Sequence, residues 1–124
     1  MKSIVTGGGG FIGSHLVEKL VRNGHKVIVI DNFKIGKKKN LKSVYNKVKI
    51  INADIRNYKK ISKFFKKIDH VYHFAALADI VPSIENPDEY YTTNVSGTYN
   101  VLKASVENKI KRFILSRMML KKII

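Results

Sequence analysis

The sequence predicts an α/β protein with a parallel sheet that carries helices on both faces. Five short runs rich in apolar residues alternate with segments of helical periodicity, and this alternation is typical of parallel strands joined by right-handed crossovers. Glycines between the first run and the first helical segment strengthen the prediction. The expected strands are Lys2–Thr6, Lys26–Ile30, Val48–Ile51, His70–Phe74 and Lys111–Ser116. The expected strand order is 3-2-1-4-5, and the sheet is expected to be truncated after the fifth strand.

The first expected strand leads into a glycine-rich segment. Gly7, Gly10 and Gly13 form the pattern GxxGxxG. Such glycines permit a sharp exit from a strand, a close approach of phosphates to the backbone and close packing of the helix on the strand. The helix N-terminus adds unpaired N–H groups and a partial positive charge. The pattern therefore predicts a dinucleotide site, and the alternative is a flexible turn.

An acidic residue closes the second expected strand. Between it and the glycines, residues 14–22 have helical spacing, with Leu16, Val17, Leu20 and Val21 on one face, and Asn23-Gly24 provides a left-handed stop. Asp31 lies 18 residues beyond Gly13, a spacing that favours hydrogen bonds to the ribose hydroxyls of an adenosine. A carboxylate there repels a ribose 2′-phosphate by about 4 kcal/mol at ~4 Å, which favours NAD over NADP. Lys34 and Lys37 would soften that repulsion. A plain turn residue is the alternative for Asp31.

The third expected strand is followed by a second acidic residue. The lysine-rich segment 33–47 before that strand is expected as a loop or a short irregular helix. Asp54 has two open interpretations: it accepts from the adenine amino group while Ile55 packs on the ring, or it caps the helix that follows. That helix is expected over 57–67. Its apolar face would comprise Tyr58, Ile61, Phe64, Phe65 and Ile68.

The fourth expected strand contains His73 and is followed by small residues. A histidine inside a buried strand is expected to be a hydrogen-bonded core residue, with a functional imidazole as the alternative. Small side chains at 75–78 would leave room for a ligand beyond the strand end. Residues 79–87 are expected as a loop and 88–108 as one long helix, with Gly97 packed closely on the sheet. The apolar stripe of that helix would comprise Tyr91, Val95, Thr98, Leu102 and Val106.

The composition of the chain excludes several classes of protein and of chemistry. The chain has no cysteine, so it has no disulfide or thiolate chemistry. No apolar run reaches the ~18–20 residues of a membrane span, and the N-terminus does not resemble a signal peptide, so a cytoplasmic location is expected. The net charge is +15, and thirteen of the 24 basic residues lie between Lys34 and Lys67. Most are lysines and no nucleic-acid motif accompanies them, so a solvated surface is expected rather than specific nucleic-acid binding.

Several sequence motifs, taken in their order along the chain, resemble the motifs of one protein family. Those motifs are TGGGGFIGSHL (6–16), DN (31–32), ADIR (53–56), VYHFAALADI (71–80), NVSGT (94–98) and KRFI (111–114). The chain is similar to the NAD-dependent nucleotide-sugar epimerases and dehydratases, which are extended short-chain dehydrogenase/reductases typified by UDP-glucose 4-epimerase. The resemblance implies a Rossmann-like fold, NAD as cofactor and a nucleotide-sugar substrate. It implies that Gly7, Gly10, Phe11, Ile12 and Gly13 hold the diphosphate, Asp31 and Asn32 the ribose, and Asp54 and Ile55 the adenine. Phe74, Ala75, Ala76 and Ala78 would line the cofactor channel, and Asn94 would act locally or near the cofactor.

Catalysis in that family depends on residues beyond the fifth strand. A serine/threonine-rich segment and a YxxxK helix follow there, and only Ser116 matches part of them. The YxxxK matches at 45–49 and 99–103 precede that strand, so neither is expected to supply the base. The expected organisation is an incomplete NAD-binding domain over 1–116, a divergent tail over 117–124, no substrate domain and no catalysis. The alternatives are a stand-alone NAD-binding module and a basic nucleic-acid-associated protein. The fifth strand is expected as an exposed edge that promotes self-association.

Overall fold

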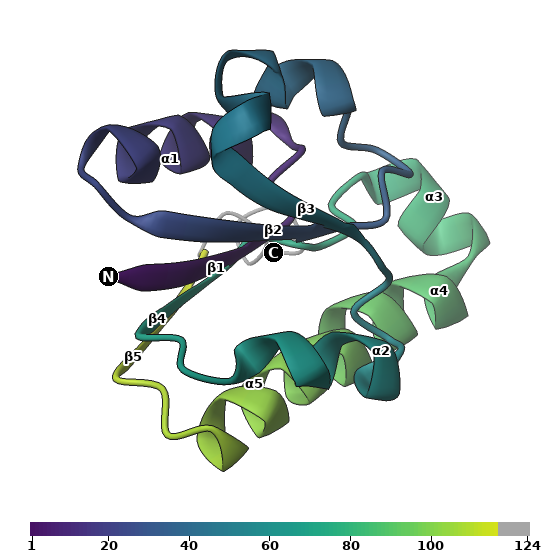
Figure 1. Ribbon diagram of the computed structural model, residues 1–124. Coiled ribbons are helices and arrows are strands. Elements are labelled where there is room, and N and C mark those ends of the chain that lie inside the picture. The colour runs from purple at the N-terminus through teal and green to yellow at the C-terminus, as the bar shows by residue number, and fades with distance from the viewer. Residues whose placement is uncertain (117–124) are drawn as a thin grey trace.

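The computed structural model describes residues 1–116, and the predicted tail at 117–124 lies outside that range. Its centre is a five-stranded parallel sheet in the order β3-β2-β1-β4-β5 (Figure 1). The predicted fold class and strand order are therefore confirmed. The strands are β1 (Lys2–Thr6), β2 (Lys26–Asp31), β3 (Val48–Asn52), β4 (His70–His73) and β5 (Arg112–Leu115).

One face of the sheet is covered by helix α1 (Phe11–Arg22) and the 3₁₀ helix η1 (Lys38–Lys47). The buried residues of this layer include Val5, Val17, Val29 and Leu41. Alternation along β1 places Val5 in this layer and the adjacent Ile4 in the opposite one. Gly24, at φ +84°, follows the end of α1 as the predicted left-handed stop.

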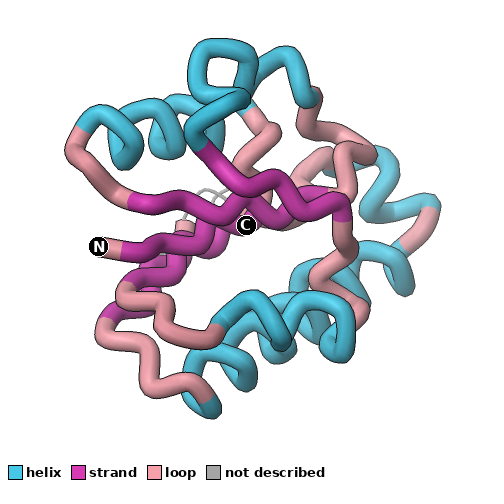
Figure 2. Tube along the Cα trace, in the orientation of Figure 1, coloured by secondary structure: helices cyan, strands magenta, loops and turns pink. Residues whose placement is uncertain are grey.

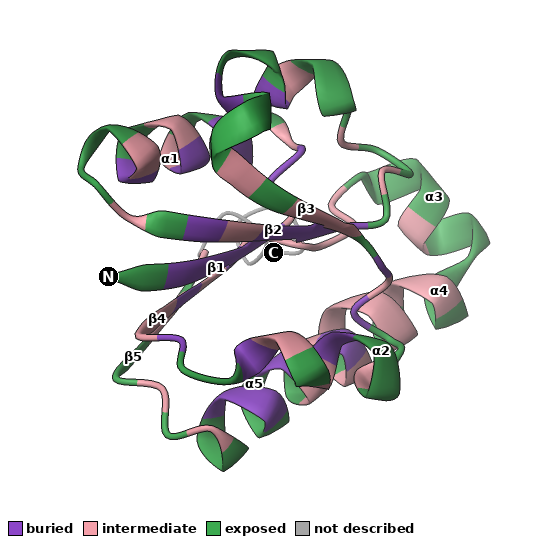
Figure 3. Ribbon diagram, in the orientation of Figure 1, coloured by how far each residue is buried: buried purple, intermediate pink, exposed green. Residues whose placement is uncertain are grey.

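The other face carries α2 (Tyr58–Ser62), the 3₁₀ turn η2 (Lys63–Phe65) and α5 (Gly97–Glu107). Its core includes Ile30, Phe65, Val71 and Val101, each fully buried. In Figure 3 the buried residues lie on the central strands and on the inner sides of α1 and α5, while the edge strands β3 and β5 contain no buried residue. The central strands are thus sandwiched between two helical layers, and a hollow remains open at the carboxyl ends of the parallel strands.

Short helices lie beyond these strand ends, in a segment predicted as a loop over 79–87 and as a helix from 88 onward (Figure 2). They are α3 (Ile80–Glu85), α4 (Pro87–Tyr91) and the π-helix η3 (Thr92–Ser96), and none contains a buried residue. The prediction of a loop over 79–87 is wrong. Pro82 and Pro87 lie in the first turns of α3 and α4, where a residue without an N–H group does not disrupt the helix. The long helix predicted over 88–108 is observed as three consecutive helical segments up to Glu107, with the π-helix η3 between α4 and α5.

The predicted apolar stripe of α5 is also wrong. Leu102 and Val106 are 40% and 76% exposed, while the buried residues of α5 are Gly97, Val101, Ala104 and Ser105. The helix packs through its small residues, and a Cβ on Gly97 would lie 2.6 Å from Cδ1 of Ile55. Gly97 is therefore closely packed as predicted, but against Ile55 in the segment between β3 and α2 and not against the sheet itself. No helix within residues 1–116 is long and apolar enough to cross a membrane.

Candidate dinucleotide site

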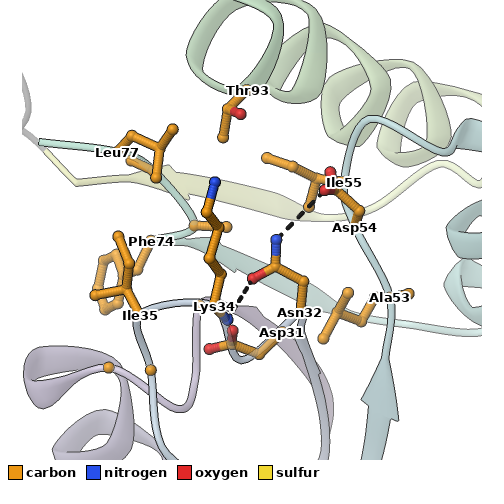
Figure 4. Close-up of a pocket in the computed structure, with 16 residues that line it drawn as sticks. Asp31, Asn32, Lys34, Ile35, Ala53, Asp54, Ile55, Phe74, Leu77 and Thr93 are labelled. Atoms are coloured by element: carbon orange, nitrogen blue, oxygen red, sulfur yellow. Dashed lines mark hydrogen bonds between the residues drawn. The ribbon is translucent and has the colours of Figure 1, made fainter. Parts of the chain in front are cut away.

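A hollow of about 110 Å³ opens at the carboxyl ends of the central strands (Figure 4). Crevices at this edge of open parallel sheets are the usual ligand sites. Residues from the ends of β1, β2, β3 and β4 meet there, although they are far apart in the sequence. Its lining includes Gly7, Gly10, Asp31, Asn32, Lys34, Asp54, Ile55, Phe74, Ala75, Ala76, Leu77 and Thr93.

The backbone of the glycine-rich turn leaves no room for a side chain at Gly7 or at Gly13. Gly7 adopts φ +70°, and a Cβ there would lie 2.6 Å from the Ala75 nitrogen. A Cβ on Gly13 would lie 2.2 Å from the Gly7 carbonyl oxygen, so α1 rests directly on the turn. At Gly10 a Cβ would approach only that same oxygen, at 3.3 Å. Gly10, which lines the hollow, therefore leaves room for a ligand beside the backbone.

The carboxylate of Asp31 is held by backbone N–H groups. Its Oδ2 accepts from the Gly9 nitrogen at 2.9 Å, and its Oδ1 accepts from the Phe33 nitrogen at 2.8 Å. The side chain is buried (8% exposed) but still lines the hollow. Asp31 thus fixes the glycine-rich turn as well as facing the crevice, a second role that spacing alone did not predict.

A second loop clamps the Gly9 peptide from its other side. The Gly9 carbonyl oxygen accepts from the Lys37 nitrogen and from Asn40 Nδ2, both at 2.9 Å. The contact between this loop and the glycine-rich turn also requires a glycine at position 36, because a Cβ on Gly36 would lie 2.7 Å from the Gly9 carbonyl carbon. Sequence reasoning missed Gly36 and Asn40; the available signal was a lone glycine shortly after the acidic residue.

Asp54 and Asn32 lie together on the adjoining wall. Asn32 Nδ2 donates to Asp54 Oδ2 at 3.3 Å, and Arg56 Nη2 donates to the same oxygen at 2.8 Å. Hydrogen bonds from the Arg56 side chain lower the pKa of Asp54, against the opposing effect of partial burial, and raise the pKa of Arg56. The interpretation of Asp54 as a helix cap is wrong: Asn57 caps α2 by accepting from the Lys60 nitrogen.

Phe74, Ala75 and Ala76 form the wall of the hollow that follows β4. Ala78 instead lines a neighbouring hollow of about 410 Å³ together with Asn94. Asn94 accepts from the Leu77 nitrogen at 2.9 Å and donates to the Leu77 oxygen at 2.8 Å. Asn94 therefore fixes the backbone at Leu77, which lines both hollows.

Three of the predicted diphosphate residues, Phe11, Ile12 and Gly13, do not line the hollow, and Gly13 instead packs against the Gly7 carbonyl group. Phe11 and Ile12 form the first turn of α1, and their side chains point largely to solvent (78% and 42% exposed). Only their backbone N–H groups remain as candidates for contact with a phosphate. This is consistent with a helix N-terminus, where the free groups belong to the backbone.

His73 is a core residue in this structure. It is fully buried, with Nδ1 2.6 Å from Thr6 Oγ1 and Nε2 2.8 Å from Thr98 Oγ1. Thr6 Oγ1 already accepts from the nitrogens of Phe74 and Ala75, so its proton is directed to Nδ1. His73 is therefore assigned as neutral with its proton on Nε2. Burial lowers its pKa to about 4.

No group of three or more potential metal-ligating side chains occurs within residues 1–116.

The glycine turn, the acid at the end of β2 and the crevice beyond the parallel strands are the features of a Rossmann-like nucleotide-binding domain. A family model described as "NAD dependent epimerase/dehydratase family" matches residues 3–117. The chain belongs to this family.

Individual relatives agree with the assignment. The chain is 37% identical over 110 residues to a UDP-N-acetyl-alpha-D-glucosaminuronate decarboxylase of Bacillus cytotoxicus, covering 89% of this chain and 34% of that protein. The crystal structure of a Thermotoga maritima UDP-glucose 4-epimerase with UDP-glucose matches with a TM-score of 0.87 and 36% identity, over 93% of this chain and 37% of that one. A Thermus thermophilus UDP-glucose 4-epimerase in complex with NAD matches with a TM-score of 0.83 and 36% identity, over 91% and 36% of the two chains. The chain thus spans about a third of the length of these relatives.

Proposed function

We propose that this chain is the NAD-binding portion of a nucleotide-sugar epimerase or dehydratase. One observation carries the proposal: the glycine turn and the Asp31 carboxylate, 18 or more residues apart in the sequence, line a single hollow at the strand ends. The open side of Gly10 fits a phosphate drawn close to the backbone. The NAD complex of the Thermus thermophilus relative supports the choice of cofactor.

The residues divide the dinucleotide among them. Backbone N–H groups of the glycine turn and of the first turn of α1, including those of Phe11 and Ile12, would hold the diphosphate. Asp31 would accept from the ribose hydroxyls beside Asn32, using lone pairs that the Gly9 and Phe33 nitrogens leave unused. Asp54 would accept from the adenine amino group, with Ile55 against the ring.

The wall after β4 would carry the cofactor toward the sugar. Phe74, Ala75 and Ala76 line the hollow and Ala78 the adjoining one, while Asn94 holds the backbone between them. When bound, NAD would accept a hydride from the sugar of a nucleotide-sugar substrate. Asn94 would act as a positioning residue, since its side chain is occupied by Leu77.

The chain as given would bind the cofactor without turning over a substrate. Tyr99, in the more helix-like of the two YxxxK matches, is 63% exposed on α5, and Lys103 lies over the Tyr58 ring, 4.5 Å from its centroid. Neither residue lines the hollow. The base that this family uses would therefore come from sequence beyond the fifth strand.

Calorimetric titration with NAD tests the proposal, with Gly10→Ala as the diagnostic variant. We expect measurable binding by the wild-type chain and at least tenfold weaker binding by the variant, because its methyl group occupies the approach to the backbone. A Cβ there approaches only one oxygen, at 3.3 Å, so thermal unfolding should show a folded variant. Absence of NAD binding by the wild-type chain, or equal binding by a folded variant, would refute the proposal.

A further inference from the structure

The two edges of the sheet differ in how they are protected. β3 forms one edge and β5 the other, and no strand within residues 1–116 lies beyond either of them (Figure 1). Open edges invite pairing with another chain, and charged side chains are a common protection against it. The β3 edge carries Lys47 directly before the strand and Lys49 within it, both exposed. The β5 strand carries a single charged residue, Arg112, which three apolar residues follow.

Every second residue of β5 turns its backbone polar groups to the open side. Arg112 and Ser116 donate their N–H groups to carbonyl oxygens of the segment 69–73, at 3.3 and 3.2 Å, and so face β4. In a β ladder the residues that bond to a given neighbour alternate along the strand. Phe113 and Leu115 lie between the residues that face β4, so they direct their N–H and C=O groups away from it.

The side chains along this edge are apolar on both faces of the sheet. Phe113 pairs in register with Val71 and packs against the core on the α5 side. Ile114 pairs with Tyr72 and lies on the α1 side, half-buried. Leu115 is 46% exposed although it is apolar. The β5 edge therefore offers a strand partner both unbonded backbone groups and apolar contacts.

We propose that β5 pairs with β5 of a second copy of this chain in antiparallel orientation, so that the two sheets join across a two-fold axis. The strand is self-complementary when Phe113 lies opposite Leu115 of the second copy and Ile114 lies opposite Ile114. In this register the outward N–H and C=O groups of Phe113 and Leu115 form reciprocal hydrogen bonds. Opposite residues also share a face of the joined sheet, as the side-chain alternation requires. Arg112 lies opposite Ser116, so the two arginines do not meet.

Charge favours a second copy at this edge and disfavours it at the other. The chain carries a net charge of +15, so two copies approach each other most easily where few charges meet. Pairing through β3 would bring Lys49 of both copies close together, whereas Phe113, Ile114 and Leu115 meet through β5. The joined sheet then ends on both sides in a lysine-bearing β3 edge. A two-fold contact of this kind closes as a dimer and does not extend into a fibre.

Disulfide formation tests the register directly, because the chain has no cysteine. Ile114 lies at a non-hydrogen-bonded pair, where Cα atoms are about 4.5 Å apart and within reach of a disulfide. Ile114→Cys in the full chain should therefore form a covalent dimer under mild oxidation, visible on a non-reducing gel. Arg112→Cys is the matched control on the same strand and the same face. Its two copies would lie about 13 Å apart along the ladder and should not cross-link.

Sedimentation of the full chain from about 10 µM to 1 mM measures the association itself. Leu115→Lys places a charge on the edge, so the dimer dissociation constant should rise at least tenfold. Tyr45→Lys is its control, because Tyr45 is also exposed (55%), lies on η1 at the opposite side of the sheet and gains the same charge. It should associate as wild type does. Thermal unfolding of both variants confirms that they are folded.

Salt gives a further readout. Raising the salt concentration from 50 to 300 mM should tighten the dimer, because screening weakens the repulsion between two basic chains. A dimer that weakens instead would be held by ion pairs and would overturn the inference. So would a chain that stays monomeric at every concentration, or cross-linking of Arg112→Cys as readily as of Ile114→Cys. Wild-type association by Leu115→Lys would place the interface elsewhere, for example on the exposed side of α5.

Discussion

Acid should destabilise this fold through one buried histidine. His73 is fully buried between Thr6 and Thr98, and burial lowers its pKa from 6.5 to about 4. A lowered pKa means that the folded chain binds a proton less readily than the unfolded chain does. The contribution of His73 is therefore intact above pH 6.5 and is lost as the pH falls from 6.5 toward 4.

The size of the loss follows from the two pKa values. With 6.5 in the unfolded chain and about 4 in the folded one, lowering the pH from 7 to 5 costs about 2 kcal/mol of unfolding free energy. The loss reaches about 3 kcal/mol well below pH 4. Such a change is a large fraction of the stability of a small domain. Asp54, whose pKa is lowered from 3.8, is ionised in both the folded and the unfolded chain between pH 7 and 5, so it does not add to the slope over that range.

Urea denaturation at pH 7, 6 and 5 measures the effect. His73→Gln supplies an uncharged donor and acceptor and removes the titrating group, so its stability should fall by about 2 kcal/mol less over the same pH range. The variant is expected to be less stable than wild type at pH 7, and the comparison concerns only the slope with pH. Parallel slopes for wild type and variant would show that the destabilisation comes from other groups and would refute the reasoning.

Two further changes test the packing and the cap of the second layer. Gly97→Ala should cost about 1–3 kcal/mol despite the higher helix propensity of alanine, because its Cβ would lie 2.6 Å and 2.7 Å from Cδ1 and Cγ1 of Ile55; a variant more stable in urea denaturation would contradict this contact. Asn57→Ala should cost about 1 kcal/mol through loss of the α2 cap, whereas Asp54→Ala should leave α2 capped. Circular dichroism and urea midpoints of the two variants distinguish them, and equal loss of helix in both would count against Asn57 as the cap.

Much of the fold was predictable because its signals are local. Strand β2 is buried on both faces, so its run Val27–Ile30 is continuously apolar and identifies a central strand without knowledge of what packs on it. Likewise, the glycines at 7 and 13 are required by the backbone itself, through a positive φ and a contact too short for any side chain. Where a residue type is dictated by its own backbone or by two-sided burial, one sequence is enough to place it.

Contacts between distant segments were not predictable in the same way. Asp31 could be placed at the end of a strand, but its bond to the Gly9 nitrogen depends on how two loops meet. The clamp of Asn40 on the Gly9 oxygen and the pair of Lys34 with Glu89 join residues 31 and 55 positions apart. Nothing in the spacing of such residues specifies the partner, because the loops between them do not follow a regular repeat.

The error over α5 has a more general physical cause. A buried face predicted from the largest apolar residues of a helix assumes that the helix buries its bulkiest side. Here Leu102 and Val106 lie on the exposed side, while Gly97, Val101 and Ala104 are buried, with Gly97 against Ile55. A helix that packs at short distance on its neighbours gains contacts with its backbone, so small residues can outweigh a bulkier stripe. A glycine inside a helix, which costs about 1 kcal/mol unless something approaches it closely, is then a better indicator of the buried face than the apolar residues around it.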